Sequence, residues 1–518
     1  MRRAVQVRSF QHKIWVLNFV VLLLTASATS TVTGREVGRL ISLEPDEMPD
    51  RLDPGILRLM SAVNHGTAEE VQAAIDRGVD LELSLYHDRT PLLEAVVKRR
   101  ELDVICVLLD AGASVHARDE MEMTPLMYAA MRSQDPELIM MLVDAGSDVH
   151  AQWIDGATAL GIAAAANPNP EILKRLILVG SDLEHQDQYG RTPLARAARD
   201  DQGVPVIRAL IQAGADVQSG SSYGSRAIDY AVHFSSDPEV VSILLERTDE
   251  PNFSKLLRSA AAHNPSVPII EKLIQEGADV NGQPGLIRLP LHAACMSNSN
   301  HAITEALIRA GADIETEGYN GLTPLYAAAG YNKNADHIRV LLSHGANREN
   351  PPNKTFSALS FAIRNKQPVE VIRALLDGGY DANERTEGNA TPLIEAAYYD
   401  SDPEIFTLLI ERGAEVDARG GKHLMTPLMV AVRKCSSVTP VQVLLDSGAN
   451  IEAKCSMGRT PLIYCAIECK NPSILKLLFD GGADSRVTDQ EGNRAIDYAK
   501  KNEVLQQFAR KYLLEEEQ

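Results

Sequence analysis

The chain has 518 residues, of which 45% are hydrophobic and 23% are charged. That apolar share is large enough to build a packed core, so wholesale disorder and a collagen-like fibre are excluded. Asp and Glu outnumber Lys and Arg by 70 to 51, which leaves a net charge of −19. Because this charge repels phosphate backbones and no Lys/Arg-rich run offsets it, we do not expect a nucleic-acid partner.

The first 28 residues have the pattern of a secretory signal. An apolar stretch runs from Ile14 to Ala26, small residues follow at Ser27 and Ala28, and positive charges precede it at Arg2, Arg3, Arg8 and Lys13. The stretch is thirteen residues long, whereas a membrane-spanning helix needs roughly 20. We therefore expect residues 1–28 to be removed and the protein to be extracytoplasmic, either periplasmic or secreted. In the alternative, an uncleaved segment anchors the chain in a membrane, facing outside.

A period of 34 residues organises the chain beyond a polar segment at 29–56. Thr-Pro-Leu, or a degenerate form of it, marks each period, and such self-similarity indicates a repeat architecture. The first residue of the motif recurs at Thr90, Thr124, Thr158, Thr192, Arg226, Leu289, Thr323, Ser357, Thr391, Thr426, Thr460 and Arg494. Two fainter copies, at 57–63 and 255–261, complete an array of fourteen units.

Each period predicts two short helices and a turn. In the unit that begins at Thr124, the threonine is a helix N-cap and Pro125 suits the first helical turn. Asp135-Pro136 is a second start signal, and Gly146 suits the left-handed residue that ends the second helix. A polar, turn-rich stretch then leads to the next threonine.

The ankyrin repeat is the family that this unit resembles, on the residues Thr124-Pro125-Leu126-Met127-Tyr128-Ala129-Ala130 and Asp144-Ala145-Gly146-Ser147-Asp148-Val149. The resemblance runs from about Leu57 to the C-terminus. It implies an all-α solenoid with short β-hairpin fingers, an ankyrin-type stack of about 14 repeats. The unit departs from the usual length of about 33 residues in the turn between its helices, where Asp/Asn-Pro replaces the usual Gly-His. A tetratricopeptide array shares the period of 34 but lacks the Gly-Ala-Asp and finger segment.

One step of the array is irregular. The spacing from Ala227 to Leu256 is 29 residues instead of 34, and residues 247–251 stand where a finger is expected. We predict a truncated finger and a kink there, because repeat arrays are held together by nearest-neighbour interfaces. The step separates repeats 1–6 (57–248) from repeats 7–14 (249–518), which end in a C-terminal capping helix.

The resemblance assigns partner contacts to the finger tip, to the residue before the threonine and to the two residues after the small pair of the first helix. Aromatic residues occupy these positions in two groups. The first group is Tyr319, Tyr331, Phe356, Tyr398 and Tyr399, and the second is Trp153, Tyr189, Tyr223 and Phe234. Exposed aromatic side chains are typical of binding hot spots. The alternative for each residue is packing against a neighbouring finger, and Tyr128, Tyr464 and Tyr498, one position earlier, are predicted core residues.

These features favour a non-enzymatic scaffold that binds a protein on the concave face of the stack. The acidity favours a basic partner. We expect no small-molecule substrate, cofactor or metal, because phosphate-binding and H-E-x-x-H motifs are absent and the six cysteines show no zinc spacing. Two further alternatives are a structural spacer anchored by the uncleaved N-terminal segment and an intracellular scaffold.

A serine hydrolase is the remaining alternative. Ser222 lies within Gly220-Ser221-Ser222-Tyr223-Gly224, which matches the G-x-S-x-G pattern of a nucleophile elbow. Such an elbow needs a buried strand before it and a helix directly after it. Because this segment falls in a predicted finger, the pattern favours a loop.

The predicted signal can be tested by sequencing the N-terminus of the protein from an expressing cell. We expect the mature chain to begin at Thr29 and to be found outside the cytoplasm. A mature chain that still begins at Met1 would instead support the membrane-anchored or intracellular alternatives.

Overall fold

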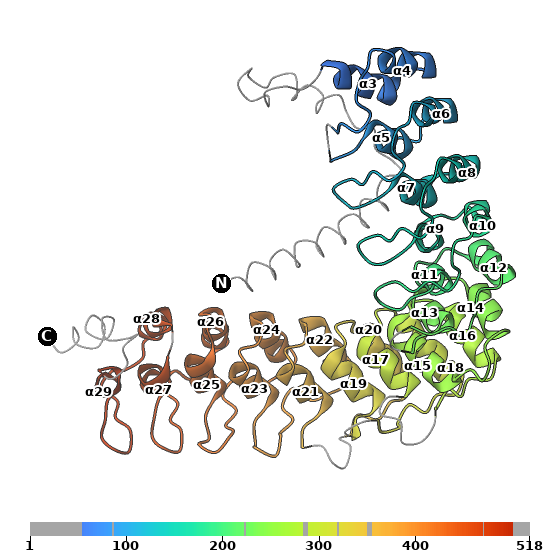
Figure 1. Cartoon of the computed structure of the whole chain (residues 1–518). Coiled ribbons are helices and arrows are strands. Elements are labelled where there is room, and N and C mark those ends of the chain that lie inside the picture. Colours follow the sequence, from blue (N-terminus) through green and yellow to red (C-terminus); the bar gives the residue numbers. More distant parts are fainter. Residues whose placement is uncertain are drawn as a thin grey trace.

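The computed structural model describes residues 54–500, apart from 85–86, 222–223, 283–288, 319–320, 350–354 and 470. Within this part, short helices joined by turns and loops form one bent stack (Figure 1). The predicted signal, most of the polar segment at 29–56 and most of the predicted C-terminal cap lie outside the described residues. The predicted all-α solenoid is confirmed.

The described helices form thirteen consecutive pairs, and the single helix α29 follows the last pair. The first helix of each pair is odd-numbered and the second is even-numbered. Their bounds are α3 (Pro54–His65), α4 (Ala68–Ile75), α5 (Pro91–Val97), α6 (Leu102–Asp110), α7 (Pro125–Arg132), α8 (Glu137–Asp144), α9 (Ala159–Ala166), α10 (Pro170–Leu178), α11 (Pro193–Arg199), α12 (Val204–Gln212), α13 (Ala227–Phe234), α14 (Pro238–Leu245), α15 (Phe253–His263), α16 (Val267–Gln275), α17 (Pro290–Ser297), α18 (His301–Arg309), α19 (Pro324–Tyr331), α20 (Asp336–Ser343), α21 (Ala358–Arg364), α22 (Val369–Asp377), α23 (Pro392–Tyr398), α24 (Pro403–Glu411), α25 (Pro427–Lys434), α26 (Thr439–Asp446), α27 (Pro461–Glu468), α28 (Pro472–Asp480) and α29 (Ala495–Ala499).

The start and stop signals of the sequence act as expected. Thr124 caps α7, because its hydroxyl oxygen accepts the backbone N–H of Met127 at 3.3 Å. Pro125 lies in the first turn, where a helix has no use for its missing N–H. Gly146 follows α8 with a φ of 97°, a conformation that strains residues with a side chain.

The core is a continuous strip that runs along the stack. Helix α7 packs against α5 and α9, and against α8 of its own pair. Four alanines at the contact between α7 and α9 are at most 1% exposed: Ala129, Ala130, Ala163 and Ala164. Their small side chains let neighbouring helices approach, so each pair buries its apolar face only against the pairs beside it.

Asparagine side chains join neighbouring units in the turn between the two helices. The buried Asn167 donates from Nδ2 to the carbonyl oxygens of Ala130 (3.0 Å) and Ser133 (2.8 Å) in the preceding unit. Asn169 caps α10 and also donates to Gln134 O at 3.0 Å. The Asn-Pro turn therefore does more than start a helix, because its amides satisfy backbone carbonyls of the preceding unit.

The fingers are hairpin-shaped loops with little strand character. The described residues contain only isolated β-bridges, at Gly220–Arg226, Gly420–Met425 and Thr488–Arg494. In one finger, Oδ1 of the buried Asp119 accepts the N–H groups of Met121 (3.0 Å) and Met123 (3.1 Å). Tyr128 on α7 donates its hydroxyl to Oδ2 of the same carboxylate at 2.5 Å. Two more fingers repeat this bond between a finger and its helix, at Asp187 with Arg196 and at Asp489 with Tyr498.

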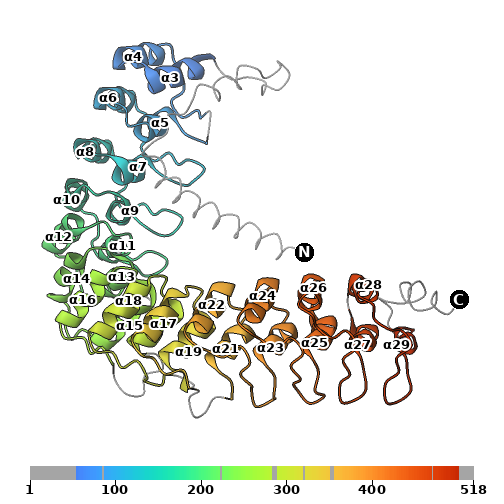
Figure 2. The same cartoon turned by 180° about the vertical axis from the view of Figure 1, so that it is seen from behind.

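The stack bends between α13 and α19, where the irregular step of the sequence lies (Figure 1). The predicted truncation is confirmed, because only residues 246–252 connect α14 to α15. Thr248 donates its hydroxyl to Leu244 O at 2.7 Å, so this link continues the end of α14 as a turn. Both views show that the fingers beside α5–α11 point into the angle between the two arms, whereas those beside α21–α29 point away from it (Figure 2). The face that carries the fingers therefore turns at the bend.

None of the helices in the described ranges has the length and apolar character that crossing a bilayer requires.

The missing finger predicts a local weak point. We expect backbone amides of residues 246–264 to exchange with deuterium faster than those of α9–α12 and α21–α24, because one of the two contacts between units is lost there. Hydrogen exchange followed by mass spectrometry measures this directly. Equal protection in the three regions would contradict the weak interface.

Candidate protein-binding surface

Three aromatic side chains are exposed at one recurring position, the last residue of the first helix. Tyr331 ends α19 and is 46% exposed, and Tyr398 ends α23 and is 56% exposed. Phe234 ends α13, at the bend, and is 47% exposed. The first helices of the pairs lie on the side of the stack that also carries the fingers (Figure 1).

The described members of the first predicted group make two sets of ring contacts in the C-terminal arm. In the first set, Phe361 on α21 contacts Tyr331 edge-on and Phe356 at a tilt, each with 5.6 Å between ring centroids. Tyr399 lies edge-on against Tyr398, 5.1 Å between centroids. Phe356 and Tyr399 are half-buried, whereas Tyr319 lies outside the described residues. We refer to Tyr331, Phe356, Phe361, Tyr398 and Tyr399 as the aromatic surface.

Phe361 is the residue that the sequence analysis missed. It occupies the helix position of Tyr128, Tyr464 and Tyr498, which was assigned to the core. Tyr128 and Tyr464 are indeed buried, but Phe361 and Tyr498 are half-buried. The available signal was Gly330 on the preceding unit. A Cβ atom there would lie 2.2 Å from Cε1 of Phe361, so the glycine leaves the space into which the ring extends.

Basic side chains cover the same surface. The Arg364 guanidinium lies 4.4 Å from the centroid of Phe356, and the Lys434 ammonium lies 5.7 Å from that of Tyr398. Arg364 also donates from Nε (3.0 Å) and Nη2 (2.6 Å) to Oε1 of Glu395. These cation–π and ionic contacts hold the rings in place while leaving the tyrosine edges exposed.

Two carboxyl groups bind residues that adjoin or contact this surface. Glu384, in the finger after α22, accepts hydrogen bonds from the hydroxyls of Ser357 and, at 3.3 Å, Ser360. Burial raises the pKa of Glu384 to about 7, against the lowering effect of the two serines. Burial also raises the pKa of Glu395 above its ordinary value, despite its contact with Arg364.

The second predicted group lies in the N-terminal arm and at the bend, and its members do not come together. The Trp153 indole is half-buried and donates from Nε1 to Met121 O at 2.6 Å, which is the packing against a neighbouring finger named as the alternative. Tyr189 is 48% exposed and lies under Arg191 at 4.7 Å. Phe234 contacts His233, with 4.3 Å between centroids. Tyr223 lies outside the described residues.

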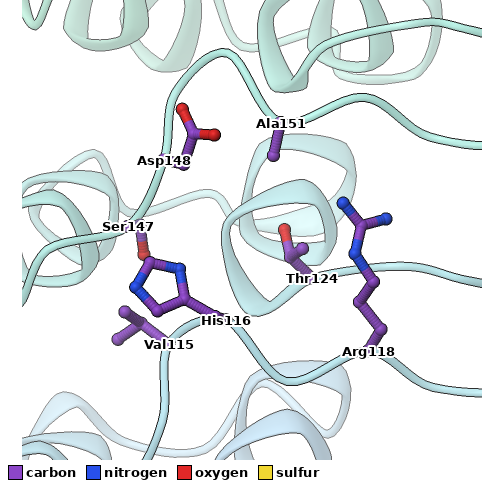
Figure 3. Close-up of a pocket in the computed structure, with 7 residues that line it drawn as sticks. All are labelled: Val115, His116, Arg118, Thr124, Ser147, Asp148 and Ala151. Carbon is purple, nitrogen blue, oxygen red and sulfur yellow. The ribbon is translucent and has the colours of Figure 1, made fainter.

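A small polar cavity of about 120 Å³ lies at the base of two fingers in the N-terminal arm (Figure 3). It is lined by Val115, His116, Arg118, Thr124, Ser147, Asp148 and Ala151. Ser147 is 8% exposed, and its hydroxyl has no hydrogen-bond partner among the described residues. Arg118 is held at the rim by donating to Glu122 O (2.8 Å) and Gln152 O (3.2 Å).

The segment with the G-x-S-x-G pattern is a tight turn. Ser221 donates its backbone N–H to Ser225 O at 2.8 Å, and Gly224 donates to Ser221 O at 2.7 Å. The segment is part of the finger before α13, and Ser222 itself lies outside the described residues. Across the described ranges, no group of three or more His, Cys, Asp or Glu side chains is placed to hold a metal ion.

Comparison with known proteins places this geometry in a family. The profile for ankyrin repeats (three copies) matches residues 59–153, 160–255, 257–351, 393–489 and 428–518. Over 105 residues the chain is 30% identical to human ankyrin repeat and SOCS box protein 6, covering 19% of this chain and 25% of that protein. Over 114 residues it is 32% identical to a putative ankyrin repeat-containing protein of Treponema pallidum (strain Nichols), covering 22% of this chain and 38% of that protein.

Over 113 residues the chain is 35% identical to human SH3 and multiple ankyrin repeat domains protein 2, covering 22% of this chain and 6% of that protein. Among solved structures, the human ASB11 ankyrin repeat domain matches 44% of this chain and 98% of its own length, with 27% identity and a TM-score of 0.39. The chain thus matches a quarter of the length of the first human relative. What is shared with these proteins is the repeat region.

The contact between Gly330 and Phe361 can be tested with a matched pair of substitutions. Alanine favours a helix over glycine by about 1 kcal/mol. Gly161→Ala in α9 should realise this gain, because the nearest neighbours of its added Cβ lie at 3.6 Å. The free energy of unfolding of Gly330→Ala should be about 1–3 kcal/mol lower than that of Gly161→Ala, because the ring of Phe361 must move to admit the new Cβ atom. Urea unfolding measures both variants, and equal effects would contradict the contact.

Proposed function

Because the chain belongs to the ankyrin repeat family, we propose that it is a non-enzymatic scaffold whose aromatic surface binds another protein. The observation that carries this proposal is that two tyrosines of this surface are exposed and are also held by ring contacts. Tyr331 and Tyr398 each expose about half of a large aromatic side chain, and ring and cation contacts hold both in place. Pre-ordered aromatic side chains lose little conformational entropy on binding, which is why they recur at interface hot spots.

The bend selects the C-terminal arm for this role. Phe361 contacts both Tyr331 and Phe356, whereas Trp153 is engaged within its own arm and Tyr189 stands apart. The finger-bearing faces of the two arms point in different directions (Figures 1 and 2). A partner that docks on the aromatic surface therefore contacts one arm, and the N-terminal arm remains available to a different molecule.

The partner that suits this scaffold is a basic protein. The net charge of −19 attracts positive molecules over distances of about a Debye length, so encounter is faster at low salt. We further propose that the scaffold acts outside the cytoplasm, on the strength of the charged and apolar pattern of residues 1–28. The variant of this proposal with an uncleaved N-terminal segment is a scaffold held at a membrane.

The proposed surface can be tested with a double substitution, Tyr331→Ala with Tyr398→Ala. The wild-type chain is first used to capture a partner from the exported fraction. We expect the double variant to bind that partner at least about tenfold more weakly, because two hot-spot rings are removed. Capture followed by mass spectrometry and then titration measures this. Unfolding midpoints should change little, since both rings project from helix ends.

Tyr189→Ala is the matched control, because Tyr189 is similarly exposed, at 48%, but lies in the other arm. It should leave capture unchanged. If the double variant still binds the partner and Tyr189→Ala does not, the binding site lies in the N-terminal arm instead.

A further inference from the structure

One position in the fold differs between the two arms in a way that changes its chemistry. The cavity of Figure 3 lies between the capping Thr124 and two residues of the following finger, Ser147 and Ala151. At the corresponding places around α21, the same numbers of residues further along, stand Ser357, Tyr380 and Glu384. Large polar side chains thus occupy, next to the aromatic surface, the space that small ones leave open in the N-terminal arm.

Within the described ranges Glu384 takes part in no ion pair. Its hydrogen-bond partners there are the hydroxyls of Ser357 and Ser360. The side chain is half-buried, so one side of it is reachable from solvent. A carboxylate in such a place bears a desolvation cost that two neutral hydroxyls offset only in part, which is why its pKa rises to about 7.

The guanidinium of Arg364, which lies on the aromatic surface, is already engaged. Arg364 directs both of its hydrogen bonds to Oε1 of Glu395. Glu395 is 3% exposed, and its Oε2 has no partner among the described residues. The hydroxyl of Tyr380, 8% exposed, also lacks a described partner, and the Glu384 charge, after burial, raises the pKa of this phenol. Arg364 thus binds Glu395 and not Glu384, and polar atoms without described partners remain near Glu384.

This group is continuous with the aromatic surface. Ser357 directly follows Phe356 in the chain, and the Phe356 carbonyl accepts the hydroxyl of Tyr326 at 3.0 Å. Arg364 links the two features, because it lies over the ring of Phe356 and binds Glu395. A cation that reaches Glu384 from solvent therefore arrives beside aromatic rings, where cation–π attraction adds to the ionic contact.

We propose that Glu384 is the acceptor for a lysine or arginine side chain of the protein that docks on the aromatic surface. The inference rests on the proposed function and specifies the chemistry of the partner. The complementary side chain supplies the positive charge that Glu384 lacks among the described residues. Charged and titratable neighbours of Glu384 are Glu395 and Asp381, both of which disfavour its ionised form, together with the phenols of Tyr326 and Tyr380.

The missing cation has a consequence for the unbound protein. The pKa of Glu384 is 4.5 in an unfolded chain and about 7 in the folded chain. Between these pH values the folded state holds a proton that the unfolded state has released. Stability contributed by this group therefore falls as pH rises from about 4.5 to 7. Glu384→Gln should remove that loss, and its urea midpoint should exceed that of the wild type at pH 8 by more than at pH 5. Glu387→Gln, an exposed change in the same finger, should show no such difference.

The partner chemistry can be tested by panning a random twelve-residue peptide library against the full-length chain at pH 8. We expect the enriched peptides to share a lysine or arginine next to apolar residues, and to bind Glu384→Gln at least tenfold more weakly than Glu387→Gln. Lowering the pH from 8 to 6 should weaken wild-type binding about tenfold, following the ionised fraction of a group of pKa near 7, and should not affect Glu384→Gln.

The outcomes separate the two proposals. Suppose that the enriched peptides fail to bind the Tyr331→Ala/Tyr398→Ala variant, which supports the aromatic surface. If those peptides lack basic residues, or bind Glu384→Gln as tightly as the wild type, the proposed role of Glu384 is overturned and the binding surface stands. Peptides insensitive to the tyrosine substitutions, or no enrichment at all, would count against the surface itself and against the inference that rests on it.

Discussion

Burial against a neighbour is the constraint on which this chain depends. A pair of helices of seven to nine residues, such as α5 and α6, is too short to be stable alone and has no closed core of its own. It is stabilised only when its apolar face is covered by the pairs on either side. The alanine contacts between α7 and α9 show what this requires, since Ala129 and Ala163 are at most 1% exposed and leave no room for larger groups.

Buried polar contacts supplement this apolar strip at regular intervals. The asparagine that follows the first helix bonds backbone carbonyls of the preceding unit, as Asn167 does in the N-terminal arm. The same contact crosses the irregular step, where Asn264 donates to Val232 O (3.0 Å) and Ser235 O (2.8 Å). The bend therefore keeps the contacts between helices and loses the finger, which explains how the finger-bearing face can turn there without interrupting the stack.

The turn of that face has a functional consequence. Phe234 and Tyr331 occupy the same position in their units, and Tyr398 lies one position earlier in its own unit. All three are similarly exposed, yet the rings and cations around them differ. The difference arises from neighbours. Gly330 makes room for Phe361, and Phe361 joins Tyr331 to Phe356, whereas Phe234 stands at the bend beside His233.

The period of 34 residues, the caps and the glycines are local properties, so the sequence alone determined the family, the helix pairs, the fingers and the irregular step. Side-chain contacts between units depend on which residues thirty or more positions apart come together, and only the tertiary structure decided those. It placed Phe361 between Tyr331 and Phe356 although its helix position is typical of the core, and engaged Trp153 with a neighbouring finger. Among the described residues it left Glu384 without an ion-pair partner. The physical reason is that a repeat pattern specifies the average environment of a position, while the occupants of the adjacent units, such as Gly330 beside Phe361, set the actual one.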